Sequence, residues 1–340
     1  MRLLITTQVV DTEDPVLGFF VRWIEEFAVH CEQIEVICLF EGKHELPANV
    51  RVHSLGKEHG RRSSFSYAAS FLALLWQLRG RYDAVFVHMN PEYVILGAPF
   101  WKLAKKRVAL WYLHKRVDLK LRIAASLADV ILTASKESFR LAAPNVHIVG
   151  HGIVVGDAPR EPHEAGAPLR ILTAGRIAPA KGVLEMLEAI DRLIARGVSS
   201  RFRILGAPAT MSDRGYSDLV DARMRALPKG VAERAGAVPH RDIPQELART
   251  DVFLNLSETG SIDKAILEAL ASGVPVVTSN EAFRDLLTPY GLYVDRNDPE
   301  GIVDALVRAP SIDIAPLTAW VKEYHELASL VPRIIATLAP

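Results

Sequence analysis

The chain has 340 residues, of which 49% are apolar and 24% charged, and its 40 basic and 40 acidic residues balance. This length predicts about two domains, and the composition is typical of a soluble globular protein. No apolar run approaches the roughly 18 residues of a membrane-spanning helix, and Cys31 and Cys38 lack a CxxC spacing or a histidine cluster, which favours buried thiols in a reducing cytosol over a disulfide or metal site.

Short apolar segments alternate with segments of helical period through the first half of the chain. The first segment, "LLITTQVV", is followed by acidic residues, which favours a strand over a signal peptide. Further strands are predicted at 34–40, 50–56, 84–89, 107–114, 129–135 and 146–152, with helices over 15–30 and 65–80 among them. This alternation predicts βαβ units and a parallel sheet that is buried on both faces.

The stretch "GDAPREPHEAGAP", residues 156–168, has no periodicity and predicts a linker. The alternation then restarts, with strands predicted at 170–175, 201–208, 251–257 and 274–280 and helices at about 182–197, at about 215–227 and within 259–277. The last pattern, 317–338, predicts one long amphipathic helix bent near Pro332. We therefore expect α/β domains over 1–155 and 156–315, a cleft between them, and a terminal helical segment over 316–340.

Two loops of the second domain join a strand to a helix, which is where parallel α/β sheets bind ligands. The loop in "LTAGRIAPAKG" carries Arg176 and Lys181 before a helix, whose free amides and dipole also favour anions. The loop in "SETGSIDK" offers Thr259, Gly260 and Ser261, whose small side chains leave amides open to a phosphate. Either loop alone could be an ordinary turn with solvated charges, but the two together predict a phosphate site.

The helix after the second loop is apolar on most sides, but it carries a polar stripe. Ser261, Lys264, Glu268 and Ser272 follow one another at steps of three or four residues. Lys264 and Glu268 could form a simple ion pair. A carboxylate beside a phosphate loop can also accept hydrogen bonds from two sugar hydroxyls. A ligand with phosphates and a ribose diol would satisfy both loops and Glu268, so the pattern predicts a nucleotide.

These motifs resemble those of a known family. "GRIAPAKG" is similar to the GR-x-x-x-x-KG signature of retaining glycosyltransferase family 4, and "LEALASGVPVV" is similar to its EAMA-x-G-x-PVV segment. The resemblance covers the second domain and the final helix. It implies the GT-B fold, in which two Rossmann-like domains face each other and a C-terminal helix crosses back to the first. It also implies transfer of a sugar from a nucleotide-sugar donor to a glycan, lipid or other hydroxyl acceptor with retention, for a surface polysaccharide or glycolipid.

Carried over to this chain, the resemblance assigns Arg176 and Lys181 to the nucleotide diphosphate. Glu268 matches the second Glu of the family's E-x7-E pair and would bind the ribose. The first Glu is missing, because Gly260 stands there and "GSID" replaces "EGFG". The donor loop would comprise Gly260, Ser261, Ile262, Asp263 and Lys264, with Asp263 and Lys264 able to take over contacts to the sugar or phosphates. No D-x-D motif occurs, and we expect neither a metal nor another cofactor. The base would contact 205–208 and 238–243.

In the first domain, "LWYLHK" places His114 at a strand end, where it resembles the family's cleft histidine and would be catalytic; a half-buried packing histidine is the alternative. "GHGI", 150–153, resembles the interdomain "NGVD" segment and would place His151 near the cleft. Other polar or turn residues could line the acceptor side: His88, Asn90, Glu92, Asp11, Asp14 and Gly18.

Residues 51–150 hold 16 basic and 6 acidic residues. Basic residues mixed with Phe, Trp and Leu could dock this domain on an anionic membrane, and the acceptor could then be lipid-linked. The alternative is that Trp76, Trp101 and Trp111 are core residues and the cations are solvated. No nucleic-acid-binding motif accompanies the charge. The sequence thus predicts a cytoplasmic protein that could lie on the inner face of the cell membrane.

Other functions remain open at this point. The missing first Glu leaves a non-catalytic scaffold or partner subunit of the same fold as an alternative. A nucleotide-sugar epimerase or hydrolase would release free nucleotide without an acceptor. A dinucleotide-dependent dehydrogenase is disfavoured because no G-x-G-x-x-G follows a strand.

Overall fold

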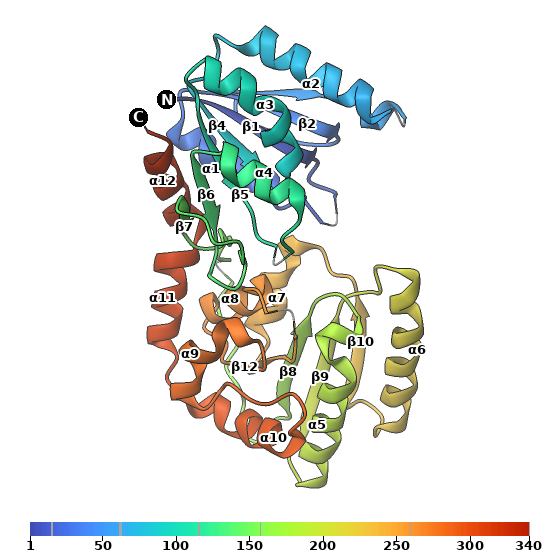
Figure 1. The fold of residues 1–340 in the computed structure, drawn as a ribbon. Coiled ribbons are helices and arrows are strands. Elements are labelled where there is room, and N and C mark those ends of the chain that lie inside the picture. Colours follow the sequence, from blue (N-terminus) through green and yellow to red (C-terminus); the bar gives the residue numbers. More distant parts are fainter. Residues whose placement is uncertain (15, 61–62, 115, 157, 259, 340) are drawn as a thin grey trace. The chain divides into compact units, whose positions relative to one another are not determined.

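The computed structural model describes residues 1–340 except 15, 61–62, 115, 157, 259 and 340 (Figure 1). The chain divides into two compact units, Met1–Gly152 with Tyr324–Pro340, and Ile153–Glu323. Each unit contains a parallel sheet, with strand order β3-β2-β1-β4-β5-β6-β7 in the first and β10-β9-β8-β11-β12 in the second. The predicted class, two α/β domains in tandem, is therefore confirmed.

The first unit alternates strands with helices as the sequence predicts. Its strands are β1 Arg2–Val10, β2 Gln33–Glu41, β3 Val50–Ser54, β4 Ala84–His88, β5 Arg107–Trp111, β6 Val130–Thr133 and β7 Val146–Ile148. Its helices are α1 Phe20–His30, α2 Ser64–Leu78, α3 Pro91–Leu103, α4 Leu119–Leu127 and α12 Leu327–Leu338, with a 3-10 turn at Lys57–His59.

The central strands of the first sheet are buried on both faces, as their mostly apolar sequences predict. In β4, Phe86 packs against Trp23 and Phe27 of α1. The neighbouring Val85 and Val87 point to the other face and join the core beneath α2 and α3. Trp101 and Trp111 are fully buried, whereas the side chain of Trp76 on α2 is 61% exposed, so the expectation that all three tryptophans are core residues is wrong for Trp76.

The second unit repeats the alternation with a smaller sheet. Its strands are β8 Leu169–Ala174, β9 Ser200–Leu205, β10 Ala232–Gly236, β11 Val252–Asn255 and β12 Val276–Thr278. Its helices are α5 Val183–Ala195, α6 Met211–Ala226, α7 Ile243–Ala248, α8 Lys264–Ala271, α9 Arg284–Leu287, α10 Pro299–Arg308 and α11 Ala315–His325, the last of which continues into the first unit. Its 3-10 turns are Pro179–Lys181, His240–Asp242, Glu281–Phe283, Thr288–Tyr290 and Ala309–Ser311.

The expected linker, 156–168, contains no helix or strand in its described residues, and it is fixed to the second unit. The Arg160 guanidinium donates to the carbonyls of Gly273 and Thr250. His163 Nδ1 lies 2.9 Å from the Asp251 carboxylate. These contacts anchor the segment along the edge where β11 begins. Asp157 lies outside the described residues.

The C-terminal segment differs from the prediction of one helix bent near Pro332. Two helices meet at Glu326, whose backbone is extended (φ −67°, ψ 139°), and Pro332 lies inside α12. The break is stabilised from outside the helix, because the Tyr324 carbonyl accepts from the Arg333 guanidinium and the His325 carbonyl accepts from the amide of Gly152. Helix α12 then packs on α1 (Figure 1). Within the described residues, none of the helices combines the length and apolarity needed to cross a bilayer.

Candidate nucleotide-binding site

The first predicted loop leaves β8 at Ala174 and enters α5 through a 3-10 turn at Pro179–Lys181. Gly182, the residue before α5, has φ 72°, and a Cβ there would lie 2.7 Å from the Leu256 carbonyl oxygen. A larger side chain would therefore clash with the segment that follows β11 as well as strain the backbone. This close approach brings Lys181 next to the second predicted loop.

Lys181 meets that loop through an ion pair. Its Nζ lies 2.5 Å from Oδ2 of Asp263, and Asn255 Nδ2 donates to the same oxygen at 3.2 Å. Asn255 is the last residue of β11, so the two loops meet at the carboxyl edge of the sheet, where ligands of such sheets bind. The structure thus brings together two residues that are 82 positions apart in sequence.

Asp263 also caps α8, because its Oδ1 accepts from the amide of Ala265 at 3.2 Å. Burial opposes its ionisation, but Lys181 and the hydrogen bonds from Asn255 and Ala265 outweigh burial and hold the pKa of Asp263 below its ordinary value. The helix terminus that was expected to offer open amides therefore already holds a carboxylate. An incoming phosphate would share Lys181 with Asp263.

The rest of the second loop is held by buried amide side chains. Asn280, after β12, donates to the Ser261 carbonyl at 3.0 Å and to Ser257 Oγ at 3.3 Å. Gly260 is buried and has φ 61°, a left-handed conformation that would strain a glutamate, the residue that the sequence resemblance expects there. Ile262 packs against the core of the second unit. Thr259 lies outside the described residues.

The polar stripe on α8 converges on Glu268, whose side chain is 10% exposed. His240, in the 3-10 turn between β10 and α7, places Nε2 2.8 Å from Oε1 of Glu268. Lys264 Nζ lies 3.7 Å from the same oxygen. Burial lowers the pKa of Lys264, and Glu268 opposes that shift. Glu268 is therefore held by a hydrogen bond with His240 as well as by the Lys264 ion pair that the sequence alone allows.

Arg176 is the most solvent-exposed of the predicted donor cations. Its side chain is 51% exposed, and its Nε lies 3.8 Å from the Asp213 carboxylate of α6. A small cavity beside it is lined by Gly175, Lys181 and Asn255, among others. Arg176 can therefore reorient toward a ligand at low cost, whereas Lys181 is already fixed.

Sequence reasoning missed several residues that shape this site. His240 falls in the segment 238–243 expected to contact the base, but its bond to Glu268 was not foreseen. Asn255 ends β11 and Asn280 lies two residues beyond β12, positions that signal loop anchors in a parallel sheet. Strand β10, "AERAG", was missed because it is polar, and it pairs only with β9 as an edge strand. The loop that carries His240 follows this strand.

The candidate residues of the first unit lie at the carboxyl ends of its strands. His114 is exposed beyond β5, and its Nδ1 accepts from the amide of Arg116 at 3.0 Å. Asn90 accepts from Gln8, and Glu92 pairs with Lys120 at 2.8 Å. The remaining candidates make contacts within the first unit. Asp14 accepts from the amides of Val16 and Leu17, Asp11 accepts from the amides of Glu13 and Lys43, and Gly18 packs on the Asp14 carbonyl. The amide of His151 donates to His325 Nδ1.

His88, in contrast, belongs to the core of the first unit. Its ring stacks on Phe20 with centroids 3.8 Å apart, and Nδ1 lies 3.0 Å from Thr7 Oγ1. Burial lowers its pKa to about 3. The neutral ring therefore serves packing.

The buried His88 makes stability depend on pH. The unfolded chain binds a proton at this histidine below about pH 6.5, and the folded chain does so only near its own lowered pKa. Unfolding free energy should therefore fall as pH drops from about 6.5, by up to about 1.4 kcal/mol per pH unit. Urea titrations at pH 7 and pH 5 should show a smaller pH effect in His88→Phe than in the wild type. His147→Gln, a change at an exposed histidine, should keep the pH effect of the wild type. An equal pH effect in all three proteins would show that His88 is not its source.

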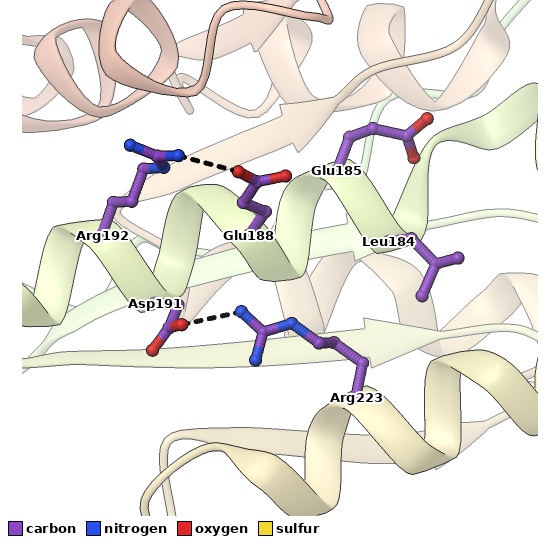
Figure 2. A pocket seen from close by; sticks show the side chains of 6 residues that line it. All are labelled: Leu184, Glu185, Glu188, Asp191, Arg192 and Arg223. Carbon is purple, nitrogen blue, oxygen red and sulfur yellow. Dashed lines mark hydrogen bonds and ion pairs between the residues drawn. The ribbon is translucent and has the colours of Figure 1, made fainter.

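A separate groove of about 440 Å³ lies on the outer side of α5. It is lined by Leu184, Glu185, Glu188, Asp191, Arg192 and Arg223. Figure 2 shows that Arg192 turns to Glu188 and that Arg223, from α6, turns to Asp191. Arg192 and Arg223 already pair with acidic residues of the groove, and Glu185 pairs with Arg296. The groove lies along the helix rather than at the strand ends. The groove therefore does not compete with the site of Lys181 and Glu268.

Comparison with known families and proteins points to the same part of the chain. Residues 168–310 match the family model described as "Glycosyl transferases group 1". The putative colanic acid biosynthesis glycosyltransferase WcaL of Escherichia coli (strain K12) is 30% identical over 178 residues, which are 50% of this chain and 43% of that protein. An Escherichia coli UDP-Gal:alpha-D-GlcNAc-diphosphoundecaprenol alpha-1,3-galactosyltransferase is 30% identical over 139 residues, 39% of this chain and 34% of that protein. The chain thus spans less than half of the length of these curated relatives.

Solved structures resemble the whole chain. Anabaena Alr3699/HepE in complex with UDP aligns with a TM-score of 0.77 and 16% identity, over 99% of both chains. The apo lipopolysaccharide outer core galactosyltransferase WaaB aligns with a TM-score of 0.68 and 15% identity, over 99% of this chain and 100% of that chain. At such identities the likeness establishes the fold, so the GT-B fold expected from the sequence is confirmed.

Proposed function

We propose that the chain is a retaining glycosyltransferase that uses a nucleoside-diphosphate sugar to build a polysaccharide or glycolipid. The observation that carries this proposal is the meeting of two loops at one sheet edge, with Lys181 on one and Glu268 on the helix that follows the other. Lys181 supplies a cation for a diphosphate, and Glu268 supplies a carboxylate for a ribose diol. The family match over residues 168–310 supports the same reading.

In the proposed reaction, the bond between the sugar C1 and the β-phosphate oxygen breaks, and the acceptor oxygen bonds to C1 from the same face. The acceptor proton passes to the departing phosphate oxygen. Negative charge develops on the leaving diphosphate, so Lys181 and Arg176 would stabilise the transition state more than the bound donor. Asp263 would keep the Lys181 ammonium in place before the donor arrives. His114 would face the transferred sugar.

We further propose UDP as the nucleotide and a lipid-linked saccharide as the acceptor. HepE was crystallised in complex with UDP and with UDP-glucose, and one curated relative acts on alpha-D-GlcNAc-diphosphoundecaprenol by its name. Peripheral contact with a membrane would bring the enzyme to such an acceptor.

The test is a radiolabelled transfer assay. UDP-[14C]glucose and UDP-[14C]galactose are each incubated with the protein, with and without GlcNAc-diphosphoundecaprenol, and lipid-extractable label and free UDP are measured. A transferase gives labelled lipid only when acceptor is present. Release of UDP without acceptor would favour the epimerase or hydrolase alternative. Absence of both products, together with no nucleotide binding, would favour the scaffold alternative.

A further inference from the structure

Helix α2 carries an apolar stripe on its solvent side. Phe65, Ala69, Leu72, Ala73 and Trp76 are all exposed and recur at helical spacing. The side chains of Phe65, Leu72 and Trp76 are 83%, 43% and 61% exposed. The core face of the same helix is formed by other residues, Phe71, Leu75 and Leu78. The helix is therefore apolar on two separate faces, and only one of them is used by the fold.

The exposed stripe continues onto the end of α3, which lies beside α2 (Figure 1). The rings of Trp76 and Phe100 meet edge to face with centroids 6.3 Å apart. One turn further, Leu103 is 87% exposed. We call the surface formed by Phe65, Leu72, Trp76 and Leu103 the α2–α3 face. Apolar patches that stay exposed in a folded unit commonly mark interaction sites.

The charges at the end of α2 and on the C-terminal half of α3 have one sign. No Asp or Glu occurs between Ser63 and Tyr82 or between Tyr93 and Val117. Among the described residues, Arg79, Lys102 and Lys105 are exposed at the ends of the two helices. The Arg79 guanidinium lies 4.3 Å above the ring of Trp76. Cations thus sit directly beside the exposed apolar side chains.

We propose that the α2–α3 face docks on an anionic lipid bilayer. Phe65, Leu72 and Trp76 would enter the boundary between head groups and acyl chains, and the flanking cations would contact lipid phosphates, as in helices that lie in a membrane surface. Tryptophan favours this boundary because its ring is apolar and its N–H is polar. A bilayer fits this surface because it supplies dense negative charge and apolar depth together.

This inference does not rest on transferase activity, so its test uses no nucleotide. The full chain is sedimented with two kinds of vesicle. One contains phosphatidylcholine alone, and the other contains phosphatidylcholine with about 30 mol% of the anionic lipid phosphatidylglycerol. We expect binding to the anionic vesicles only, weakened by added salt because surface charge is screened. The double variant Phe65→Ser/Trp76→Ser should bind at least about tenfold more weakly. Arg79→Glu/Lys105→Glu should also lose binding.

The matched control replaces exposed apolar residues of the second unit, Met211→Ser/Leu219→Ser, which are 74% and 58% exposed. It should bind like the wild type, and thermal melting should show all variants folded, since every changed side chain is exposed. Equal binding by Phe65→Ser/Trp76→Ser, or no binding by the wild type, would overturn the proposal. Sedimentation equilibrium tests a second copy as occupant: a dimer that the double variant abolishes would also overturn it.

Discussion

Replacing Lys181 with alanine should lower the turnover of the nucleotide-sugar donor by about 10²–10³-fold, the usual cost of losing one preorganised group that stabilises developing charge. Lys181 is a cation of the proposed donor site that the structure holds in place, with Nζ 2.5 Å from Asp263. Its loss removes charge where the diphosphate would leave. The measurement is the initial rate of nucleotide release at saturating donor and acceptor.

The same change also leaves Asp263 buried without its cation, which by itself costs about 3–5 kcal/mol of folding free energy. Lys181→Ala/Asp263→Asn separates the two effects, because the neutral amide needs no ion pair. The double variant should recover much of the melting temperature of the wild type while turnover stays low. Recovery of turnover as well would refute the role of Lys181 at the diphosphate.

Arg176→Ala should lower turnover by about 10²-fold with little change in melting temperature, because this side chain is half exposed and its pairing with Asp213 is loose. Arg214→Ala is the matched control, since Arg214 is exposed on α6 nearby. Turnover in both variants like that of the wild type would exclude Arg176 from the reaction.

Glu268→Ala should abolish the rise in melting temperature that a nucleotide produces. A ligand that binds only the folded state at about 100 times its Kd stabilises it by about 2.7 kcal/mol. Glu268 is the carboxylate proposed to accept both ribose hydroxyls, and the loss of such a buried acceptor leaves them unpaired. The measurement is thermal melting with UDP, GDP and ADP. The nucleotide that gives the largest shift identifies the base.

His240 and Glu258 provide the controls for Glu268. His240→Ala should weaken the shift without removing it, because His240 only orients Glu268 through a 2.8 Å hydrogen bond. Glu258→Gln should leave the shift intact, because the Glu258 side chain is 65% exposed and pairs with Arg296. If the shift were lost in Glu258→Gln but kept in Glu268→Ala, Glu268 would not be the ribose ligand, and the proposed assignment would be wrong.

Local patterns in the sequence carried the fold class. Runs such as "LLITTQVV" and "DVFLNLS" are mostly apolar because these strands are largely buried on both faces. A strand buried on both faces is apolar at successive positions, so the pattern can be recognised within a single short stretch of sequence. The edge strand β10 is only partly buried, so its sequence is polar and shows no apolar pattern that would predict a strand.

The sequence by itself also predicted which loops would form a site, because glycines, cations and carboxylates stand at strand-to-helix junctions. Only the tertiary structure decided how they are paired. Lys181 pairs with Asp263, and His240 bonds to Glu268. The amide of Gly152 donates to the carbonyl of His325, where α11 ends. Each contact joins residues that are far apart in sequence. Likewise, the spacing of Trp76 on α2 cannot tell a core face from an exposed one, because that choice depends on which side of the helix the sheet covers.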